Sequence, residues 1–174
     1  MKRTVLTLAA LACLGACKEE IAEIPLPVNM TVEAVSYYCQ MSVLEHGGPK
    51  AQIHLEGMPA PLFFAQVRDA MAFLKSPERD HRVVVTYVSD MGSALDWSTP
   101  GIDNWTVADT AVFVIEGGIR GGMGAPEVVP FADQTKAEAF VTRYGGRIVS
   151  LEEIPDDVVI GPVDPDIPLT EPTS

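Results

Sequence analysis

The sequence has few cysteines and few basic residues, and each shortage excludes a class of protein. Its three cysteines lie at positions 13, 17 and 39. No two of them have the spacing of a CxxC redox motif, and three are too few for a four-cysteine zinc site or a disulfide-stapled scaffold. Lys and Arg number 12 against 24 Asp and Glu, a formal charge of -12, so the chain lacks the basic surface that nucleic acid binding requires.

The N-terminus has the pattern of an export signal. Lys2 and Arg3 are the only charged residues before an apolar stretch at residues 4–16, as in a secretory signal peptide. This stretch is too short for a stable membrane-spanning helix. It ends in the sequence LGAC, which resembles the bacterial lipobox, whose cysteine is lipidated and becomes the first mature residue. We therefore predict a signal peptide at residues 1–16 and lipidation of Cys17; the alternative is an ordinary secretory signal with a chance cysteine.

Lipidation would hold the protein to a membrane on the periplasmic side of the cell envelope. Residues 17–30, which include two prolines, are then predicted to be a flexible tether. Lys18, in place of Asp, favours the outer membrane by resemblance to the sorting rule of Gram-negative lipoproteins. Removal of the signal leaves 10 basic and 24 acidic residues, a charge of -14, and Cys39 becomes the only free thiol.

Hydrophobic periodicity predicts strands and a helix in each half of the mature chain. In the first half, strands are predicted at residues 31–36, 51–55 and 82–88, with a helix at 64–75. In the second half, strands are predicted at 110–115, 127–131 and 147–151, with a helix that begins after Asp133 and ends at Gly145.

The recurring order predicts an α+β fold in which two similar ββαβ units, at about residues 31–90 and 106–152, pack together. Units this small rarely fold alone, so the domain at 31–155 should share one core and contain small antiparallel or mixed sheets. The alternative is one α+β domain without duplication. Residues 156–174, with four prolines, five acids and no Lys or Arg, are predicted to be a disordered acidic tail.

The segment Cys39-Gln40-Met41 places a thiolate and a thioether one residue apart. In an extended segment such side chains point to the same side, with Cα atoms roughly 6.5–7 Å apart, and can converge on one ion. Sulfur ligands of these two kinds select Cu(I) over hard cations and suit Zn(II) less. Met123 lies between glycines on a predicted loop, where it has no helical stripe to belong to, so it is predicted as a third ligand between the two units.

The three histidines and one further methionine differ in how well their positions in the sequence suit metal binding. His46 follows Cys39 by seven residues and is a candidate ligand or a neighbour of one. Met91, beside a glycine, is a weaker candidate. His54 is predicted to be solvated on the polar side of its strand, and His81 to lie on the surface in a charged loop.

Two other functions remain open from the residues alone. Cys39 with His46 as its base would suit a thiol-dependent enzyme, but no nucleophile elbow, oxyanion-forming motif or P-loop accompanies them, so we expect no enzyme activity. Cys39 would be inert in a structural lipoprotein that tethers a maturation complex.

Four segments in order resemble the NosL family of nitrous oxide reductase accessory lipoproteins. They are residues 38–52 (YCQMSVLEHGGPKAQ), 88–92 (VSDMG), 103–105 (DNW) and 121–131 (GGMGAPEVVPF), and the resemblance covers nearly all of residues 34–157. It implies a periplasm-facing lipoprotein that binds one Cu(I) ion and delivers it for assembly of the copper–sulfide centre of nitrous oxide reductase. It also implies a paired ββαβ fold.

The resemblance further implies the partners and the site. The partners would be a membrane ABC-type transporter and its periplasmic subunit, which form the maturation complex. Cys39 and Met41 occupy the CxM positions of the family, Met123 the methionine of its GMG loop, and His46 a position where many members have histidine. Because each chain has one thiol, either a monomer or a copper-bridged dimer is compatible with the sequence.

Overall fold

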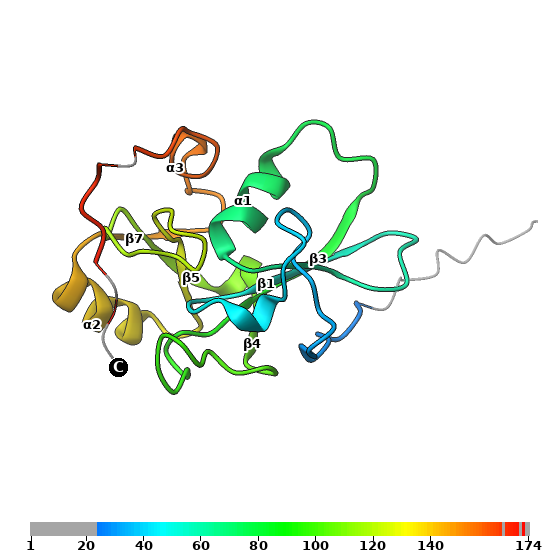
Figure 1. Cartoon of the computed structure of the whole chain (residues 1–174), viewed down its shortest axis with the longest axis horizontal. Helices are drawn as coiled ribbons and strands as arrows, with labels where there is room; N and C mark the ends of the chain where they lie inside the picture. The colour runs from blue at the N-terminus through cyan, green and yellow to red at the C-terminus, as the bar shows by residue number, and fades with distance from the viewer. Residues whose placement is uncertain (1–23, 165, 171, 173–174) are drawn as a thin grey trace, which may run out of the picture.

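A computed structural model describes residues 24–164, 166–170 and 172 (Figure 1). The predicted signal peptide and Cys17 lie outside the described residues. In the part of the chain that is described, no helix has the length and apolar character needed to cross a membrane.

The described chain forms two small antiparallel sheets, each accompanied by a helix (Figure 1). The first has the strand order β2-β1-β3-β4 and consists of β1 (Ala51–Leu55), β2 (Leu62–Phe64), β3 (Val83–Ser89) and β4 (Trp105–Val107), with α1 (Val67–Lys75) between β2 and β3. The second has the order β6-β5-β7 and consists of β5 (Val112–Ile115), β6 (Val129–Phe131) and β7 (Arg147–Ser150), with α2 (Gln134–Tyr144) between β6 and β7. The 3-10 helices η1 (Val43–Glu45) and η2 (Ala108–Thr110) and the short α3 (Asp156–Val159) complete the elements.

Both sheets repeat one topology. In each, the first strand of the unit lies between the second and the third, pairs antiparallel with both, and the helix connects those two flanking strands. The first sheet has β4 in addition, paired with β3. The predicted α+β class with two ββαβ units is therefore confirmed. The predicted strand at residues 31–36 is wrong: this segment makes only isolated bridges, and the second strand of the first unit is β2, whose three residues are too few to show a period.

One hydrophobic core joins the two units. Phe64 and Met71 from the first unit and Phe113 and Ile115 from β5 are buried in the same cluster. Val114 points to the opposite side of β5, into a second cluster beneath α2. Since β5 is covered on both faces, neither unit has a complete core of its own.

The predicted tether is wrong for residues 24–30, which pack against the first sheet. The side chain of Gln52 accepts a hydrogen bond from the Val28 N–H at 2.8 Å and donates one to the Val28 carbonyl at 2.9 Å. The Tyr87 hydroxyl donates to the Pro25 carbonyl at 2.8 Å. Polar side chains of the strands therefore hold this segment through hydrogen bonds to its backbone. No pattern within the segment itself predicts these bonds.

The predicted disordered tail, residues 156–174, is also wrong where the chain forms α3. Val159 is buried in the shared core. The guanidinium group of Arg68 donates to the carbonyls of Val158 at 3.1 Å and Gly161 at 2.9 Å. A distant arginine thus satisfies carbonyls at the end of a short helix, and acidic composition alone does not disclose such a contact.

Candidate metal centre

A tight turn carries Cys39 and Met41. The Gln40 N–H donates to the Ser36 carbonyl at 2.9 Å, and the Ser36 N–H donates to the Met41 carbonyl at 2.8 Å. Gln40 has a φ of 58°, in the left-handed region, and its side-chain amide donates to carbonyls of the same turn. The extended geometry predicted for this segment is therefore wrong, because the turn closes on its own backbone groups.

The turn is attached to the connection between β2 and α1. The buried Ser36 hydroxyl accepts a hydrogen bond from the Ala65 N–H at 3.2 Å. Cys39 is half-buried and packs against a small cluster that includes Val43 and Ala65. Met41 is 44% exposed. One of the two candidate sulfur ligands is thus partly shielded, and the other faces solvent.

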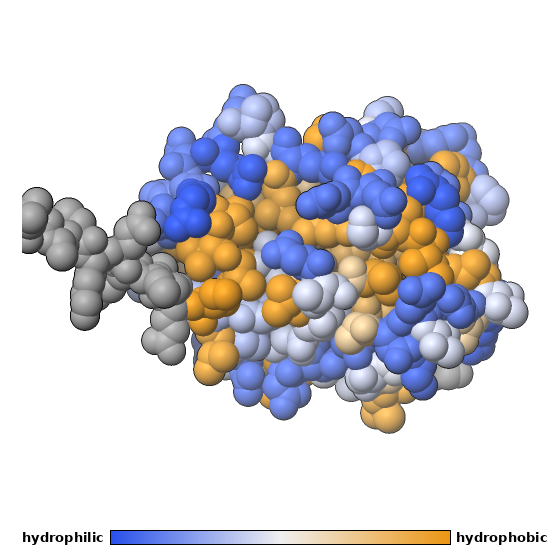
Figure 2. All heavy atoms as spheres, turned by 180° about the vertical axis from the view of Figure 1, so that it is seen from behind, coloured by the Kyte–Doolittle hydropathy of each residue, from blue (hydrophilic) through white to orange (hydrophobic). Residues whose placement is uncertain are grey.

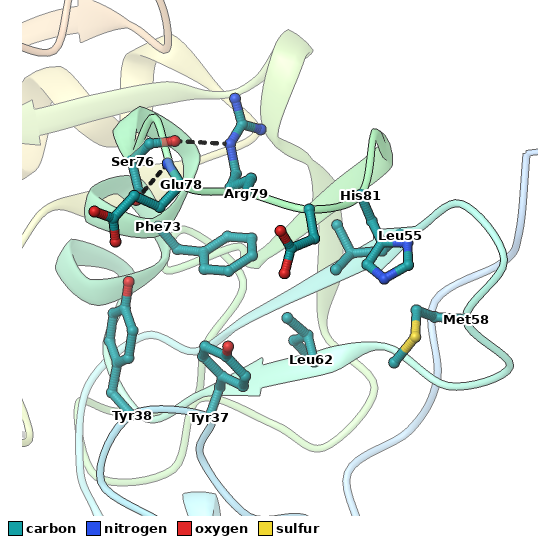
Figure 3. Close-up of a pocket in the computed structure, with 11 residues that line it drawn as sticks. Tyr37, Tyr38, Leu55, Met58, Leu62, Phe73, Ser76, Glu78, Arg79 and His81 are labelled. Atoms are coloured by element: carbon teal, nitrogen blue, oxygen red, sulfur yellow. Dashed lines mark hydrogen bonds between the residues drawn. The ribbon is translucent and has the colours of Figure 1, made fainter.

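Aromatic rings hold the turn against α1 beside a pocket of about 340 Å³ (Figure 3). The rings of Tyr37 and Phe73 meet edge to face at 5.5 Å, and those of Tyr38 and Phe64 at 5.6 Å. Figure 3 shows both tyrosines along one side of the pocket, facing Phe73. These two residues directly precede Cys39, so their packing fixes where the thiol-bearing turn lies.

Met123 lies at the tip of a glycine-rich loop from the second unit. The Gly124 N–H donates to the Gly121 carbonyl at 2.9 Å and closes the loop. The Met123 N–H lies 3.3 Å from Oε1 of Gln66, the buried residue that precedes α1, and donates to it. The Met123 side chain is 38% exposed. A residue of the first unit therefore holds the backbone of the candidate ligand in the second.

His46 has one ring nitrogen held and the other without a partner. Its Nδ1 lies 3.2 Å from the Gly122 carbonyl. Because a carbonyl only accepts, Nδ1 carries the hydrogen in this contact and Nε2 carries the lone pair. Nε2 is buried and has no hydrogen-bond partner among the described residues. Metal-ligating histidines commonly have this arrangement, in which the second nitrogen donates to a backbone carbonyl.

The turn, His46 and the Met123 loop meet at Ala65. Ala65 binds the turn through its N–H, as described above, and its carbonyl lies under Gly122, where an added Cβ would be 3.5 Å away. These contacts bring the chain segments that carry the four predicted ligands, from both units, around the connection between β2 and α1: Cys39, Met41, His46 and Met123. No hydrogen bond among the described residues joins Cys39 to His46.

Two weaker candidates lie elsewhere. His54 is buried, with Nε2 at 3.1 Å from Oε1 of Gln52, and burial lowers its pKa. Its predicted solvation is wrong because the segment at residues 24–30 covers the polar side of β1. Met91 packs against the cluster beneath α2, which accounts for its side chain. His81 is exposed, as predicted.

A sequence model of the NosL family matches residues 27–159. The chain belongs to the NosL family. The copper-binding lipoprotein NosL of Achromobacter cycloclastes is 53% identical over 163 residues, which cover 93% of this chain and 84% of that protein. The copper-binding lipoprotein NosL of Stutzerimonas stutzeri is 28% identical over 138 residues, which cover 79% and 70%.

A solved structure of the NosL family shares the fold. The crystal structure of the copper chaperone NosL from Shewanella denitrificans superposes with a TM-score of 0.68 at 30% identity, covering 75% of this chain and 97% of that one. The paired ββαβ arrangement is therefore that of a NosL protein.

This NosL-family chain also buries a lysine and a glutamate under the site, and neither was predicted. Lys50 Nζ donates to the carbonyls of Gly47 at 3.1 Å and Gly48 at 2.8 Å. Burial lowers its pKa to about 8, against the attraction of Glu127. Both residues lie in segments that resemble the family, next to proline and near glycines. Such a sequence context lacks the hydrophobic periodicity that predicts burial.

Glu127 lies below the Met123 loop. Its Oε1 accepts hydrogen bonds from two backbone N–H groups at 2.9 Å, while Oε2 has no partner among the described residues. An added Cβ at Gly121 would lie 2.7 Å from this Oε2, so the loop backbone covers the carboxyl closely. Burial raises the pKa of Glu127 to about 8, and the two N–H bonds and Lys50 oppose the rise.

We expect Glu127→Gln to flatten the dependence of stability on pH below about pH 8. Since the folded state binds the Glu127 proton more tightly than the unfolded state does, this group stabilises the fold below its unfolded pKa of 4.5, and the contribution is lost as pH rises through about 8. Glutamine keeps the acceptor oxygen but does not titrate. Urea unfolding at pH 5 and pH 8 measures the effect, with the exposed Glu138→Gln as the control. An unchanged difference between the two pH values would contradict the assignment.

Proposed function

We propose that this chain is a lipid-anchored copper chaperone that binds one Cu(I) ion and delivers it for assembly of the copper–sulfide centre of nitrous oxide reductase. The observation that carries the proposal is that segments of both units bearing soft side chains lie around one connection, beside a buried histidine nitrogen that has no hydrogen-bond partner among the described residues. The names of its NosL relatives, copper-binding lipoprotein and copper chaperone, support the same function.

The donor set favours Cu(I) as the bound species. One thiolate, two thioethers and one imidazole are soft or borderline ligands, which suit Cu(I) better than Cu(II) or hard cations. The exposed side chains of Met41 and Met123 leave the ion open to an incoming ligand. A methionine or histidine of a partner would displace these thioethers one at a time, while Cys39 retains the ion until the last exchange.

The cellular setting follows from the N-terminal sequence and the family. Cys17 would carry the acyl chains and hold the protein on the periplasmic side of the envelope, at the outer membrane by the sorting rule. The receiving partner would be the membrane ABC-type transporter with its periplasmic subunit. In that oxidising compartment the single thiol of Cys39 must be kept reduced or metal-bound, since a free thiol there is open to oxidation.

A competition titration tests the metal assignment. The acylated mature protein in detergent should take one Cu(I) per chain from a competing chelator, and Zn(II) should bind far more weakly. We expect Met123→Leu to lower the Cu(I) affinity at least about tenfold, because leucine keeps the volume but removes the thioether.

Met91→Leu is the matched control for Met123→Leu. Both methionines adjoin glycines on loops, but Met91 packs beneath α2, so its replacement should leave the Cu(I) affinity unchanged. Equal losses in both variants, or equal binding of Zn(II) and Cu(I) by the parent protein, would contradict the proposed site.

A further inference from the structure

The first described residues form an extended segment with an apolar outer edge. Ile24, Leu26 and Val28 are 62%, 81% and 43% exposed, while Pro25 and Pro27 between them are half-buried. With a period of two, the three aliphatic side chains lie on the same side of the segment, away from the sheet. The outward side of such a segment usually carries polar residues. We call these three residues the aliphatic ridge.

The ridge is held in place by hydrogen bonds to its backbone and by Met30, two residues after it. Gln52 binds both backbone groups of Val28, and Tyr87 binds the Pro25 carbonyl, as described above. Met30 is buried, and its N–H donates to the Ile102 carbonyl at 2.9 Å. These bonds oppose any folding of the ridge back onto the domain to bury its own side chains.

The position of the ridge in the chain points to its occupant. Ile24 lies seven positions after Cys17 and Val28 eleven, so even a fully extended chain keeps the ridge within about 25–40 Å of that cysteine. We propose that the aliphatic ridge lies on the surface of the lipid bilayer to which Cys17 is anchored and thereby fixes the orientation of the domain. This inference rests on the lipid anchor of the proposed function.

The charges around the ridge select the kind of lipid surface. Residues 24–34 contain no Lys or Arg and one acid, Glu33, and the mature chain carries a charge of -14. Attraction to anionic headgroups is therefore excluded as the source of binding, and insertion of aliphatic side chains among zwitterionic lipids remains. Figure 2 shows apolar side chains gathered on one face of the molecule between hydrophilic regions.

Contact with the bilayer would also set the position of the copper site. Met30, two residues after the ridge, belongs to the buried cluster against which Cys39 packs. The ridge and the thiol are thus linked through one rigid group of side chains. A domain held by both the acyl chains and the ridge would present its site at a constant height above the membrane that anchors it.

Quenching by brominated lipid tests the contact. The acylated full chain with Leu26→Trp is placed in vesicles of zwitterionic phosphatidylcholine and phosphatidylethanolamine, with Ile160→Trp as the matched control. Ile160 is 56% exposed beyond the end of α3 (Figure 1). After subtraction of the parent spectrum, brominated phosphatidylcholine should at least about halve the emission added by Leu26→Trp and change that of Ile160→Trp by less than about a tenth. The quenching should not change with salt.

The possible outcomes distinguish failure of the ridge contact from failure of the lipid anchor and from failure of copper binding. Equal emission with and without bromine for acylated Leu26→Trp overturns the inference, and a blue-shifted but unquenched emission shows instead that protein, such as a second copy, covers the ridge. Mass spectrometry reports acylation: its absence at Cys17 overturns the anchor together with this inference. Cu(I) binding is measured on the same samples and should be unaffected by Leu26→Trp, so its loss in the parent protein would overturn only the copper assignment.

Discussion

Replacing Cys39 with serine should lower the Cu(I) affinity at least about a thousandfold. The thiolate is the only anionic ligand among the four, since the two thioethers and the imidazole are neutral. It therefore supplies most of the attraction for a monovalent soft cation. A serine hydroxyl has nearly the same shape but is a hard, neutral donor, and Cys39 is only half-buried, so the fold should be preserved.

The competition titration described above measures this loss, and the urea unfolding midpoint checks that the variant is folded. In cells that make nitrous oxide reductase, Cys39→Ser should leave the enzyme without its copper–sulfide centre, which its absorption spectrum reports. Retention of parental Cu(I) affinity by a folded Cys39→Ser protein would rule out the proposed site.

Gly122→Ala should destabilise the protein by about 1–3 kcal/mol and weaken Cu(I) binding, because its side chain has no room. An added Cβ would lie 2.6 Å from the Gly47 carbonyl oxygen and 2.8 Å from Cβ of His46. Both are far inside ordinary contact, and the first is rigid backbone. Relief of the overlap would move the loop away from His46 and break the Nδ1 contact that orients its ring.

Gly47→Ala is the matched control, because it lies on the opposite side of the same contact. There an added Cβ would be 3.5 Å from the nearest atom, on Trp97, which is ordinary van der Waals distance. We expect it to unfold at nearly the parental urea concentration and to bind Cu(I) normally. Equal behaviour of the two variants would mean that close packing at Gly122 does not position the site.

The fold shows how a chaperone can combine retention with release. Hydrogen bonds hold the backbone that carries the proposed ligands: the Cys39 turn is bonded to Ala65, and the Met123 loop is bonded to Gln66. The two thioether side chains are nevertheless exposed. A rigid frame with accessible ligands permits an ion to be passed by ligand exchange without unfolding of the domain.

The candidate ligands could be named from the sequence, whereas the backbone geometry around them could not. A methionine between glycines and a thiol two residues from another methionine are local features, and local features identify donor types. The extended geometry inferred for Cys39 and Met41 failed because Gln40 adopts a left-handed conformation that its own side chain stabilises. Lys50 and Glu127 were missed because their burial results from the close approach of two glycine loops from opposite units.

The sequence by itself determined the repeated ββαβ order, since this order depends on periodicity within a few residues. The soft donors and the export signal stay predictions from local patterns of the same kind. Only the tertiary structure decided how the two ends of the described chain pack against the domain and which residues surround His54. Residues 24–30 are held by Gln52 and Tyr87, and the carbonyls at the end of α3 by Arg68. Such bonds join residues tens of positions apart, and they exist only after packing brings a polar side chain to a backbone group that no local pattern marks.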